Sequence, residues 1–284
     1  HSISKVIKAM EICKNNAYKI DIHMMPDLPG STPEMDKAMF HELYTSDKYQ
    51  PDQVKVYPCS VVPWTKIKEW YDNGSYKPYG ENKALMADVM EFIMTQCPPW
   101  IRMPRIIRDI PEHYIEGGLK CSNMRQVATA DLKKNQLTTQ EIRFREIGRH
   151  PEFTIDDAQY FVRSFRASNG TEYFLSFETP KNEAIYGFIR LRIPDKKTDK
   201  THSKQVMFDE TITSSTGLIR ELHVYGGVER VNTKGRRESI QHSGLGTKLL
   251  QSAEEICKRE NMNRVAIISG IGVRNYYEKR GYDL

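Results

Sequence analysis

Apolar positions in the first hundred residues alternate between helical and strand-like spacing. The first helix is predicted over residues 2–16, where apolar side chains recur every three or four positions. The same reasoning predicts further helices over 35–44, 64–70 and 84–95, and strands over 18–25 and 53–57. In the last of these helices the apolar face is expected to comprise Leu85, Val89, Phe92 and Ile93. Alternating strands and helices are typical of an α/β unit, so this part is predicted to be a portion of a (β/α) barrel.

The pattern changes at about residue 154. An amphipathic helix is predicted over 155–166, and strand-like runs follow over 172–177, 185–193, 205–212 and 218–225. A second amphipathic pattern covers 249–257 and a buried-strand pattern covers 265–268. Strands followed by a helix and a last strand indicate an α+β fold with a mixed sheet. The chain is therefore predicted to combine an α/β part with an α+β part.

A glycine-containing segment connects the last long strand to the second amphipathic helix. Residues 241–248 read Gln-His-Ser-Gly-Leu-Gly-Thr-Lys. Glycine at 244 and 246 lets the main chain approach an anion closely, and the helix start offers unpaired N–H groups at the positive end of its dipole. The segment predicts a pyrophosphate-binding loop. The alternative is an ordinary glycine-rich helix start.

Longer motifs resemble a known family. The order of strand, Gln-x-x-Gly-x-Gly, helix and strand is similar to the acetyl-CoA-binding core of the GNAT acyltransferases. Residues 270–282, Gly-Ile-Gly-Val-Arg-Asn-Tyr-Tyr-Glu-Lys-Arg-Gly-Tyr, closely resemble a segment of the catalytic third subunit of the Elongator complex. Four upstream motifs occur in that family's order, at 23–29, 98–100, 108–111 and 143–148. The resemblance implies part of a radical S-adenosylmethionine domain over 1–98, a tRNA-facing connector over 99–150 and a GNAT domain over 151–284.

Cysteine spacing departs from this family. Its radical domain holds a [4Fe-4S] cluster through three closely spaced cysteines, and no two cysteines of this chain are so close. The five cysteines are Cys13, Cys59, Cys97, Cys121 and Cys257. S-adenosylmethionine and the cluster are therefore expected only in the full-length family member, and no metal is expected in this chain. We expect a truncated sequence, with the cluster loop before residue 1 and a further strand after residue 284; the alternative is a homologue without the cluster.

Composition is compatible with a soluble two-domain protein. The chain has 284 residues, of which 39% are hydrophobic, and its longest apolar runs are far shorter than the roughly twenty residues that a membrane span needs. The dispersed and odd number of cysteines indicates reduced thiols in a reducing compartment. These features predict a cytoplasmic protein, with the nucleus as a second location, and no membrane partner.

Positive charge is concentrated in the connector. Residues 100–150 hold ten Lys or Arg against six acidic residues, which accounts for most of the net charge of +5. Arg102, Arg105 and Arg108 recur every third residue near Trp100, and such an arrangement can offer guanidiniums to phosphates and a ring to a base. The alternative is a solvated basic face. The resemblance implies contact with the tRNA anticodon arm by Arg102, Arg105, Arg108, Arg143 and Arg145.

The resemblance also implies which residues bind acetyl-CoA. Main-chain groups of Leu222, His223 and Val224 would pair with the pantetheine amides, and the loop amides would hold the pyrophosphate. The full set of expected cofactor-binding residues is Glu221, Leu222, His223, Val224, Gln241, Ser243, Gly244, Leu245, Gly246, Thr247 and Tyr277. The histidines at 223 and 242 are interpreted as hydrogen-bonding residues, since no cysteine lies at zinc-site spacing.

Three residues are expected to be catalytic. The resemblance places Tyr277 beside the thioester, where a phenol can protonate the departing thiolate, and makes Tyr276 the less favoured member of the pair. Glu221 occupies the position of a carboxylate base, and burial in an apolar strand is expected to raise its pKa. The alternatives are packing roles for the tyrosines, and for Glu221 an exposed strand edge or an ion pair with Arg220 or His223.

Two classes of function compete at this stage. The resemblance implies an acetyl-CoA-dependent enzyme that forms 5-carboxymethyluridine at the tRNA wobble position, with other Elongator subunits as partners in a eukaryote. A protein lysine acetyltransferase is the alternative from the same fold, and a non-catalytic RNA-binding homologue is a further one. The positive connector favours tRNA, since it would repel a cationic histone tail.

Overall fold

The computed structural model describes residues 2–121, 123–195, 212–226 and 244–283. The chain forms two compact units, one comprising His1–Ile20 with Glu146–Leu284 and the other comprising Asp21–Arg145. We call the first the five-stranded unit, after its sheet, and the second the methionine-rich unit, after its core. The division into three domains at residues 98 and 150 stays a prediction.

A strand–helix–strand element begins the methionine-rich unit. Strands β1 (Asp21–Met24) and β2 (Gln53–Val56) pair in parallel, and helix α2 (Pro33–Thr45) connects them. The segment 102–105 hydrogen-bonds through its backbone along β2. Parallel strands joined through a helix are the repeating unit of a (β/α) barrel. The predicted helix over 35–44 and the two predicted strands are confirmed within a few residues.

Helices and two short strands complete this unit. They are β3 (Ser60–Val61), α3 (Lys66–Asp72), η1 (Tyr79–Glu81), α4 (Lys83–Thr95), η2 (Glu112–Tyr114), β4 (Gly117–Gly118), α5 (Met124–Lys134) and α6 (Ile142–Arg145). Strands β3 and β4 pair in antiparallel fashion. The predicted helices over 64–70 and 84–95 are confirmed as α3 and α4.

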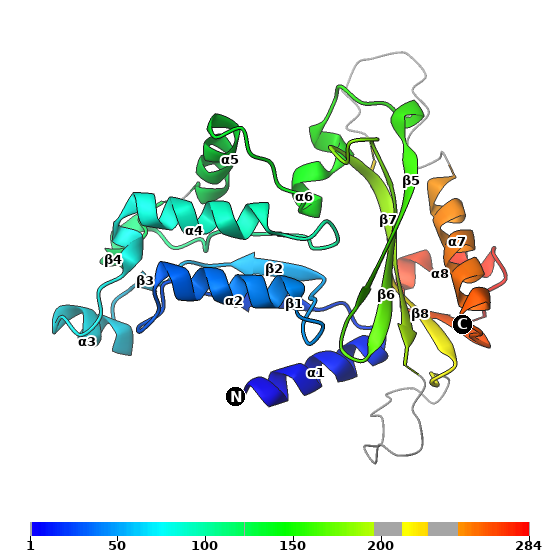
Figure 1. Ribbon diagram of the computed structural model, residues 1–284, viewed down its shortest axis with the longest axis horizontal. Coiled ribbons are helices and arrows are strands. Elements are labelled where there is room, and N and C mark those ends of the chain that lie inside the picture. Colours follow the sequence, from blue (N-terminus) through cyan, green and yellow to red (C-terminus); the bar gives the residue numbers. More distant parts are fainter. Residues whose placement is uncertain (1, 122, 196–211, 227–243, 284) are drawn as a thin grey trace. The chain divides into compact units, whose positions relative to one another are not determined.

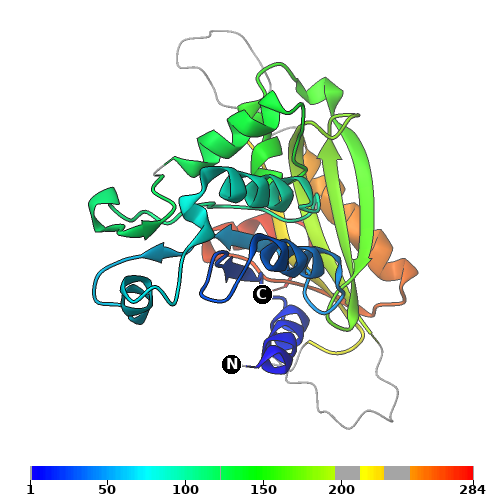
Figure 2. The same cartoon turned by 60° about the vertical axis from the view of Figure 1, so that its left-hand side comes forward.

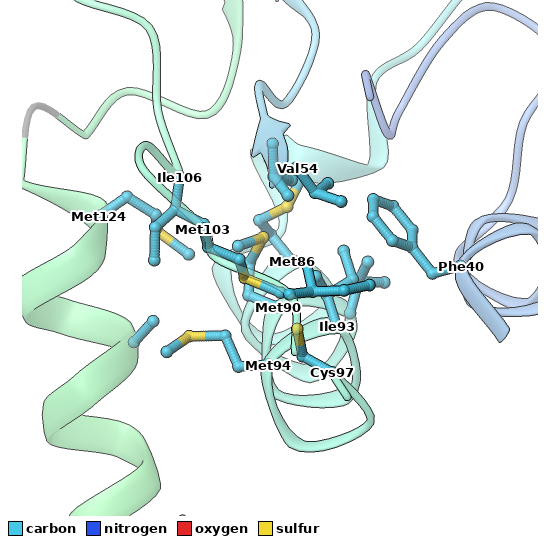
Figure 3. Close-up of a cluster of buried hydrophobic side chains, with 14 of the residues drawn as sticks. Phe40, Val54, Met86, Met90, Ile93, Met94, Cys97, Met103, Ile106 and Met124 are labelled. Carbon is cyan, nitrogen blue, oxygen red and sulfur yellow. The ribbon is translucent and has the colours of Figure 1, made fainter. Parts of the chain in front are cut away.

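The predicted apolar face of α4 is partly wrong. Leu85 is 40% exposed, and the buried side chains of this helix are Met86, Val89, Met90, Ile93 and Met94. Figure 3 shows the methionines directed into one core with Phe40, Val54, Met103 and Met124. Val89 and Ile93 are buried as predicted, whereas the methionines, which are unbranched and fill irregular space, form the rest of the face.

The loop after β1 is anchored by a buried carboxylate. Asp27 has a positive φ of 68°, and its carboxylate accepts the N–H groups of Tyr79 and Gly80, both at 2.8 Å. The Asp27 N–H in turn donates to Asp36 (2.7 Å). Burial raises the pKa of Asp27 to about 6, although the two N–H donors act to lower it. These contacts hold the 23–29 motif in one conformation.

The five-stranded unit is built on one mixed sheet in the order β5-β6-β7-β8-β9. Its strands are β5 (Gln159–Arg166), β6 (Gly170–Glu178), β7 (Ile185–Pro194), β8 (Thr216–Val224) and β9 (Arg264–Ile267). All neighbours are antiparallel except β8 and β9, which are parallel. The strands predicted at 172–177, 185–193, 218–225 and 265–268 are confirmed, whereas the run at 205–212 lies almost wholly outside the described residues.

Helices lie against both faces of this sheet. α7 (Leu245–Arg259) packs Leu249, Leu250 and Ala253 against odd-numbered residues of β7 (Figures 1 and 2). The end of α1 (Ile3–Asn15) meets even-numbered residues of β7, which point to the other face because side chains alternate along a strand. The helices predicted over 2–16 and 249–257 are therefore confirmed.

The helix predicted over 155–166 is wrong. The structure has a short 3-10 turn, η4 (Ile155–Asp157), followed by strand β5, whose eight residues all pair with β6. Along β5, half-buried Phe161, Arg163 and Phe165 alternate with exposed neighbours. This period of two, formed largely by aromatic and β-branched residues, indicates a strand, and the tertiary pairing with β6 overrides the weaker helical pattern.

One face of the sheet carries a buried ionic cluster. The Glu172 carboxylate forms ion pairs with Lys14, Arg192 and Arg220, with N···O distances of 3.5, 3.0 and 2.9 Å. None of the four side chains is more than 2% exposed. Arg192 also donates to the Asn15 side chain (2.7 and 2.9 Å). This cluster attaches the end of α1 to the sheet through charges rather than apolar packing.

Candidate functional site

The sheet opens between β8 and β9. Their pairing extends over four residues, from Thr216 with Arg264 to Ile219 with Ile267. The following part of β8, up to Val224, pairs with β7. Where β8 no longer pairs with β9, its main-chain N–H and C=O groups are available along that edge. An extended ligand can form hydrogen bonds with them, as an added strand does.

A β-bulge marks the point of opening. Arg190 of β7 pairs with Glu221, and the next residue, Leu191, pairs with Ile219, so Arg220 is the extra residue. As a result Arg220 and Glu221, although consecutive, both form ion pairs on the face opposite α7. A bulge of this kind bends a strand and redirects its side chains.

The start of α7 lies beside this opening. Gly244 is the N-cap residue with a φ of +77°, a conformation that glycine adopts without strain. A Cβ atom at Gly246 would lie 2.8 Å from the Tyr276 hydroxyl and 3.6 Å from Val224. Leu245 is buried and Thr247 is in the first turn. Gln241, His242 and Ser243 lie outside the described residues.

Helix α8 (Arg274–Glu278) supplies the two tyrosines. Tyr277 is half-buried and packs against the core beneath α7, with its ring centroid 5.2 Å from Tyr276 and 6.1 Å from Tyr282. Burial raises the pKa of the Tyr277 phenol, so its hydroxyl carries a proton at neutral pH. A protonated, partly enclosed phenol is suited to donate a proton.

Arg280 is a site residue that sequence reasoning missed. Its guanidinium lies 3.6 Å from the ring centroid of Tyr276 and donates to the hydroxyl of Thr247 (2.9 Å) and the carbonyl of Tyr276 (2.7 Å). It therefore links the start of α7 to α8 and places a positive charge beside the glycine loop. The sequence did contain a signal for this contact, because Arg280 follows Tyr276 by four residues and residues four apart on a helix lie on the same side.

Comparison with known families identifies the unit that holds these features. Residues 139–282 match the acetyltransferase (GNAT) family. The chain belongs to this family. Residues 51–134 match the radical SAM C-terminal domain. The GNAT match includes β5 to β9, α7 and α8, so the sheet opening, the glycine loop and the tyrosine pair all belong to the acetyltransferase part.

Relatives resemble the chain along its whole length. It is 38% identical to the tRNA uridine(34) acetyltransferase of Methanocaldococcus infernus, over 99% of this chain and 52% of the relative. It is 36% identical to Elongator complex protein 3 of Saccharomyces cerevisiae, over 100% and 50% respectively. The solved structure of the archaeal Methanocaldococcus infernus Elp3 with an N-terminal deletion matches with a TM-score of 0.88 and 37% identity, over 100% of this chain and 65% of that one.

These matches confirm the predicted family resemblance and the predicted order of a radical SAM part followed by a GNAT part. The chain spans about half the length of the curated relatives it matches.

Glu221 does not have the environment expected of a base. It is paired with Arg190 (2.9 Å) and Lys19 (3.0 Å), and its side chain is 14% exposed. Burial acts to raise its pKa, but these two cations outweigh burial and hold the pKa below its ordinary value. The predicted raised pKa is wrong, and the alternative of an ion pair is realised with Arg190 and Lys19. A stabilised carboxylate is a weak proton acceptor.

Two of the five expected tRNA-binding arginines serve internal contacts. Arg145 is 1% exposed and donates to the carbonyls of Gln140 (2.8 Å) and Pro99 (2.7 Å). Arg143 is half-buried and donates to the carbonyl of Pro104. Because the Arg145 guanidinium is buried and donates to backbone carbonyls, it is not accessible to a phosphate, and we do not propose Arg145 as a tRNA contact.

The other three arginines differ in exposure. Arg105 and Arg108 are exposed, and Arg105 forms an ion pair with Asp109 at 3.1 Å. Arg102 is half-buried, and its backbone bridges to β2. Trp100 is also half-buried and donates its indole N–H to the Gln50 side chain (3.1 Å). Among the five arginines expected to bind tRNA, Arg105 and Arg108 are therefore the exposed ones.

The residues present do not form a site for an iron–sulfur cluster. Within the described parts of the chain, no group of three or more His, Cys, Asp or Glu side chains is placed to hold a metal ion. The five cysteines are all free thiols. The described residues also include no helix that is long and apolar enough to span a membrane.

Proposed function

We propose that the five-stranded unit binds acetyl-CoA and hydrolyses it in response to tRNA, as part of a tRNA-modifying enzyme of the Elongator type. The product of that enzyme would be 5-carboxymethyluridine at the wobble position. The observation that carries this proposal is that the open edge of β8, the side-chain-free start of α7 at Gly246 and the half-buried phenol of Tyr277 occur together. Two of the most similar relatives are named for acetylation of tRNA uridine 34.

The two ends of acetyl-CoA would be held by different backbone groups. The pantetheine amides would add to the β8 edge at Leu222, His223 and Val224, as a further strand does. The pyrophosphate would lie on the first N–H groups of α7, where the helix dipole favours an anion. Arg280 would add a positive charge to this loop. We also propose that Gln241 and Ser243 bind the cofactor, as expected from the sequence.

Tyr277 would supply the proton that the leaving group needs. When the acetyl group departs, the CoA sulfur carries negative charge, and a phenol beside it would stabilise that charge by donating a hydrogen bond or its proton. The Tyr276 hydroxyl lies against Gly246 at the glycine loop. We therefore assign Tyr276 to the pyrophosphate end and Tyr277 to the thioester end.

tRNA would meet the methionine-rich unit at Arg105 and Arg108, with Arg102 as a partly exposed neighbour. We infer the anticodon arm as the bound element, a cytoplasmic setting and, in a eukaryote, association with the other Elongator subunits. S-adenosylmethionine chemistry would require three closely spaced cysteines, whereas the five cysteines of this sequence lie far apart.

Acetyl-CoA turnover tests this function directly. The chain should release CoA slowly on its own and faster when total tRNA is added. Equal turnover with tRNA and with a polyanion such as heparin would contradict a tRNA-linked reaction, and absence of acetyl-CoA binding would contradict the site itself.

Replacing Gly246 by Glu should weaken acetyl-CoA binding about 100-fold, or roughly 2.7 kcal/mol, because a like charge would face the pyrophosphate. Gly246→Ala adds a methyl group against the Tyr276 hydroxyl without charge and should have a smaller effect. Titration calorimetry measures both. The control is Gln251→Glu, which adds the same charge to an exposed position of the same helix. Equal affinities for Gly246→Glu and this control would place the pyrophosphate elsewhere.

Replacing Arg105 and Arg108 together by Gln should lower the salt dependence of tRNA binding. Each phosphate contact contributes about 0.7 to 0.9 to the slope of log affinity against log salt, so the slope should fall by up to about two units. Filter binding between low and moderate salt measures this slope. The control replaces two exposed lysines of α1, Lys5 and Lys8. If the control changes the slope more, the RNA surface lies on the five-stranded unit.

A further inference from the structure

The proposed reaction needs a proton acceptor that the ion-paired Glu221 does not provide. When water or another hydroxyl attacks a thioester carbonyl, the attacking oxygen must lose a proton in the same step. A carboxylate whose pKa is held down by Arg190 and Lys19 takes up this proton poorly. The acceptor must therefore be sought among neighbouring groups on the same face of the sheet.

His223 is in the right place for this role. It lies two residues beyond Glu221 on β8, and side chains two apart on a strand point to the same face. It is exposed, and it belongs to the part of β8 beyond the last pair with β9. The imidazole is therefore presented at the sheet opening, on the face opposite α7.

Aromatic rings hold the imidazole in one orientation. Phe174 and Phe188 are buried and stacked with their centroids 5.1 Å apart. Phe188 stacks in turn on His223 at 6.0 Å with an interplanar angle of 16°, and Tyr225 covers His223 at 4.3 Å. The stack runs from the core to the surface and ends at the imidazole. A base held by such packing keeps its geometry through the reaction.

Charged side chains lie next to the stack. Arg190 lies over the rings of Phe188 (5.1 Å) and Phe174 (5.3 Å), and it is paired with Glu221, which also pairs with Lys19. These side chains are engaged with one another, and all three carry charge already. An imidazole can exchange a proton near neutral pH, which guanidinium and ammonium groups do not.

We propose that His223 is the general base of the acetyl-CoA reaction, an inference that rests on the function proposed above. An imidazole nitrogen of His223 takes a proton from water, the water oxygen bonds to the thioester carbonyl carbon, and the carbon–sulfur bond breaks. The Tyr277 phenol gives its proton to the leaving sulfur. The products are acetate and CoA. The imidazolium then releases its proton to solvent, and the phenolate takes up a proton from solvent, so both residues return to their starting state.

Replacing His223 by Gln should lower tRNA-stimulated acetyl-CoA turnover about 100- to 1,000-fold, the range of one general base. Acetyl-CoA affinity, measured by calorimetry, should stay within about twofold, since main-chain groups at this position make the contact. In the wild type the rate should fall as imidazoles become protonated below a pH of about 7. This decrease, the acidic limb of the pH–rate profile, should be absent in His223→Gln. Added imidazole should restore part of the rate to His223→Ala.

The controls separate this inference from the function on which it rests. His41→Gln makes the same substitution at an exposed position of α2 and should keep both rate and acidic limb. Glu221→Gln should keep the acidic limb even if its rate changes. An unchanged rate and limb in His223→Gln would overturn the proposal, as would a loss of acetyl-CoA affinity equal to the loss of rate. A wild-type chain without tRNA-stimulated turnover would instead contradict the proposed function.

Discussion

Glu172→Gln is expected to destabilise the five-stranded unit by about 3–5 kcal/mol, because it leaves buried cations without their counter-charge. Lys14, Arg192 and Arg220 all converge on this one carboxylate, and all are 0–1% exposed. Burial lowers the pKa of Arg192 and the neighbouring Arg220 lowers it further, whereas Glu172 opposes both effects. Urea unfolding at neutral pH, followed by circular dichroism, measures the change in free energy of unfolding.

Asp195→Asn is the matched control for this prediction. Asp195 is 45% exposed and pairs with Arg166, which is 51% exposed, so its loss should cost about 0–1 kcal/mol. A similar, small effect of both substitutions would mean that water reaches the Glu172 cluster. In that case the end of α1 would be held to the sheet by other contacts.

Tyr277→Phe is expected to lower tRNA-stimulated acetyl-CoA turnover about 10- to 1,000-fold, the range that one proton-donating or hydrogen-bonding group supplies. The ring that packs against Tyr276 and Tyr282 remains, so folding and acetyl-CoA affinity should be nearly unchanged. Tyr277→Ala removes the ring as well and should cost roughly 3 kcal/mol or more of stability. Steady-state kinetics and thermal unfolding of both variants distinguish the two roles.

Tyr282→Phe controls for the loss of a phenol at a neighbouring ring. Its hydroxyl donates to Glu254 (2.6 Å), so this variant should lose about 1 kcal/mol of stability and keep its turnover. Wild-type turnover in Tyr277→Phe, together with early melting of Tyr277→Ala, would assign Tyr277 to packing alone and leave the fold assignment intact.

The two faces of the sheet have different tasks. The face toward α7 is apolar and makes the core, with Ile189 and Leu191 packed against Leu249 and Ala253. The opposite face carries buried ion pairs and the stacked rings that lead to His223. The bulge at β8 adds a charged residue to that opposite face at the point where the sheet opens.

Local patterns were sufficient for much of this fold. The helical spacing in α1, α2 and α7 and the strands β6 to β9 follow from apolar patterns, which depend only on neighbours along the chain. The glycine loop and the 270–282 motif identified the family, since a backbone that must approach an anion leaves glycines at set positions. The half-buried β5 was misread because its aromatic residues fit a helical face nearly as well as a strand.

Charged side chains depended on partners distant in the sequence. The low pKa of Glu221 requires Lys19, some two hundred residues earlier, and Arg190 on the adjacent strand. Arg145 looked like a surface cation, yet its guanidinium satisfies carbonyl groups inside the methionine-rich unit. The sequence by itself determined which elements form and which family they belong to. Only the tertiary structure decided which charges are buried, because electrostatic energy depends on distance in space and on the exclusion of water.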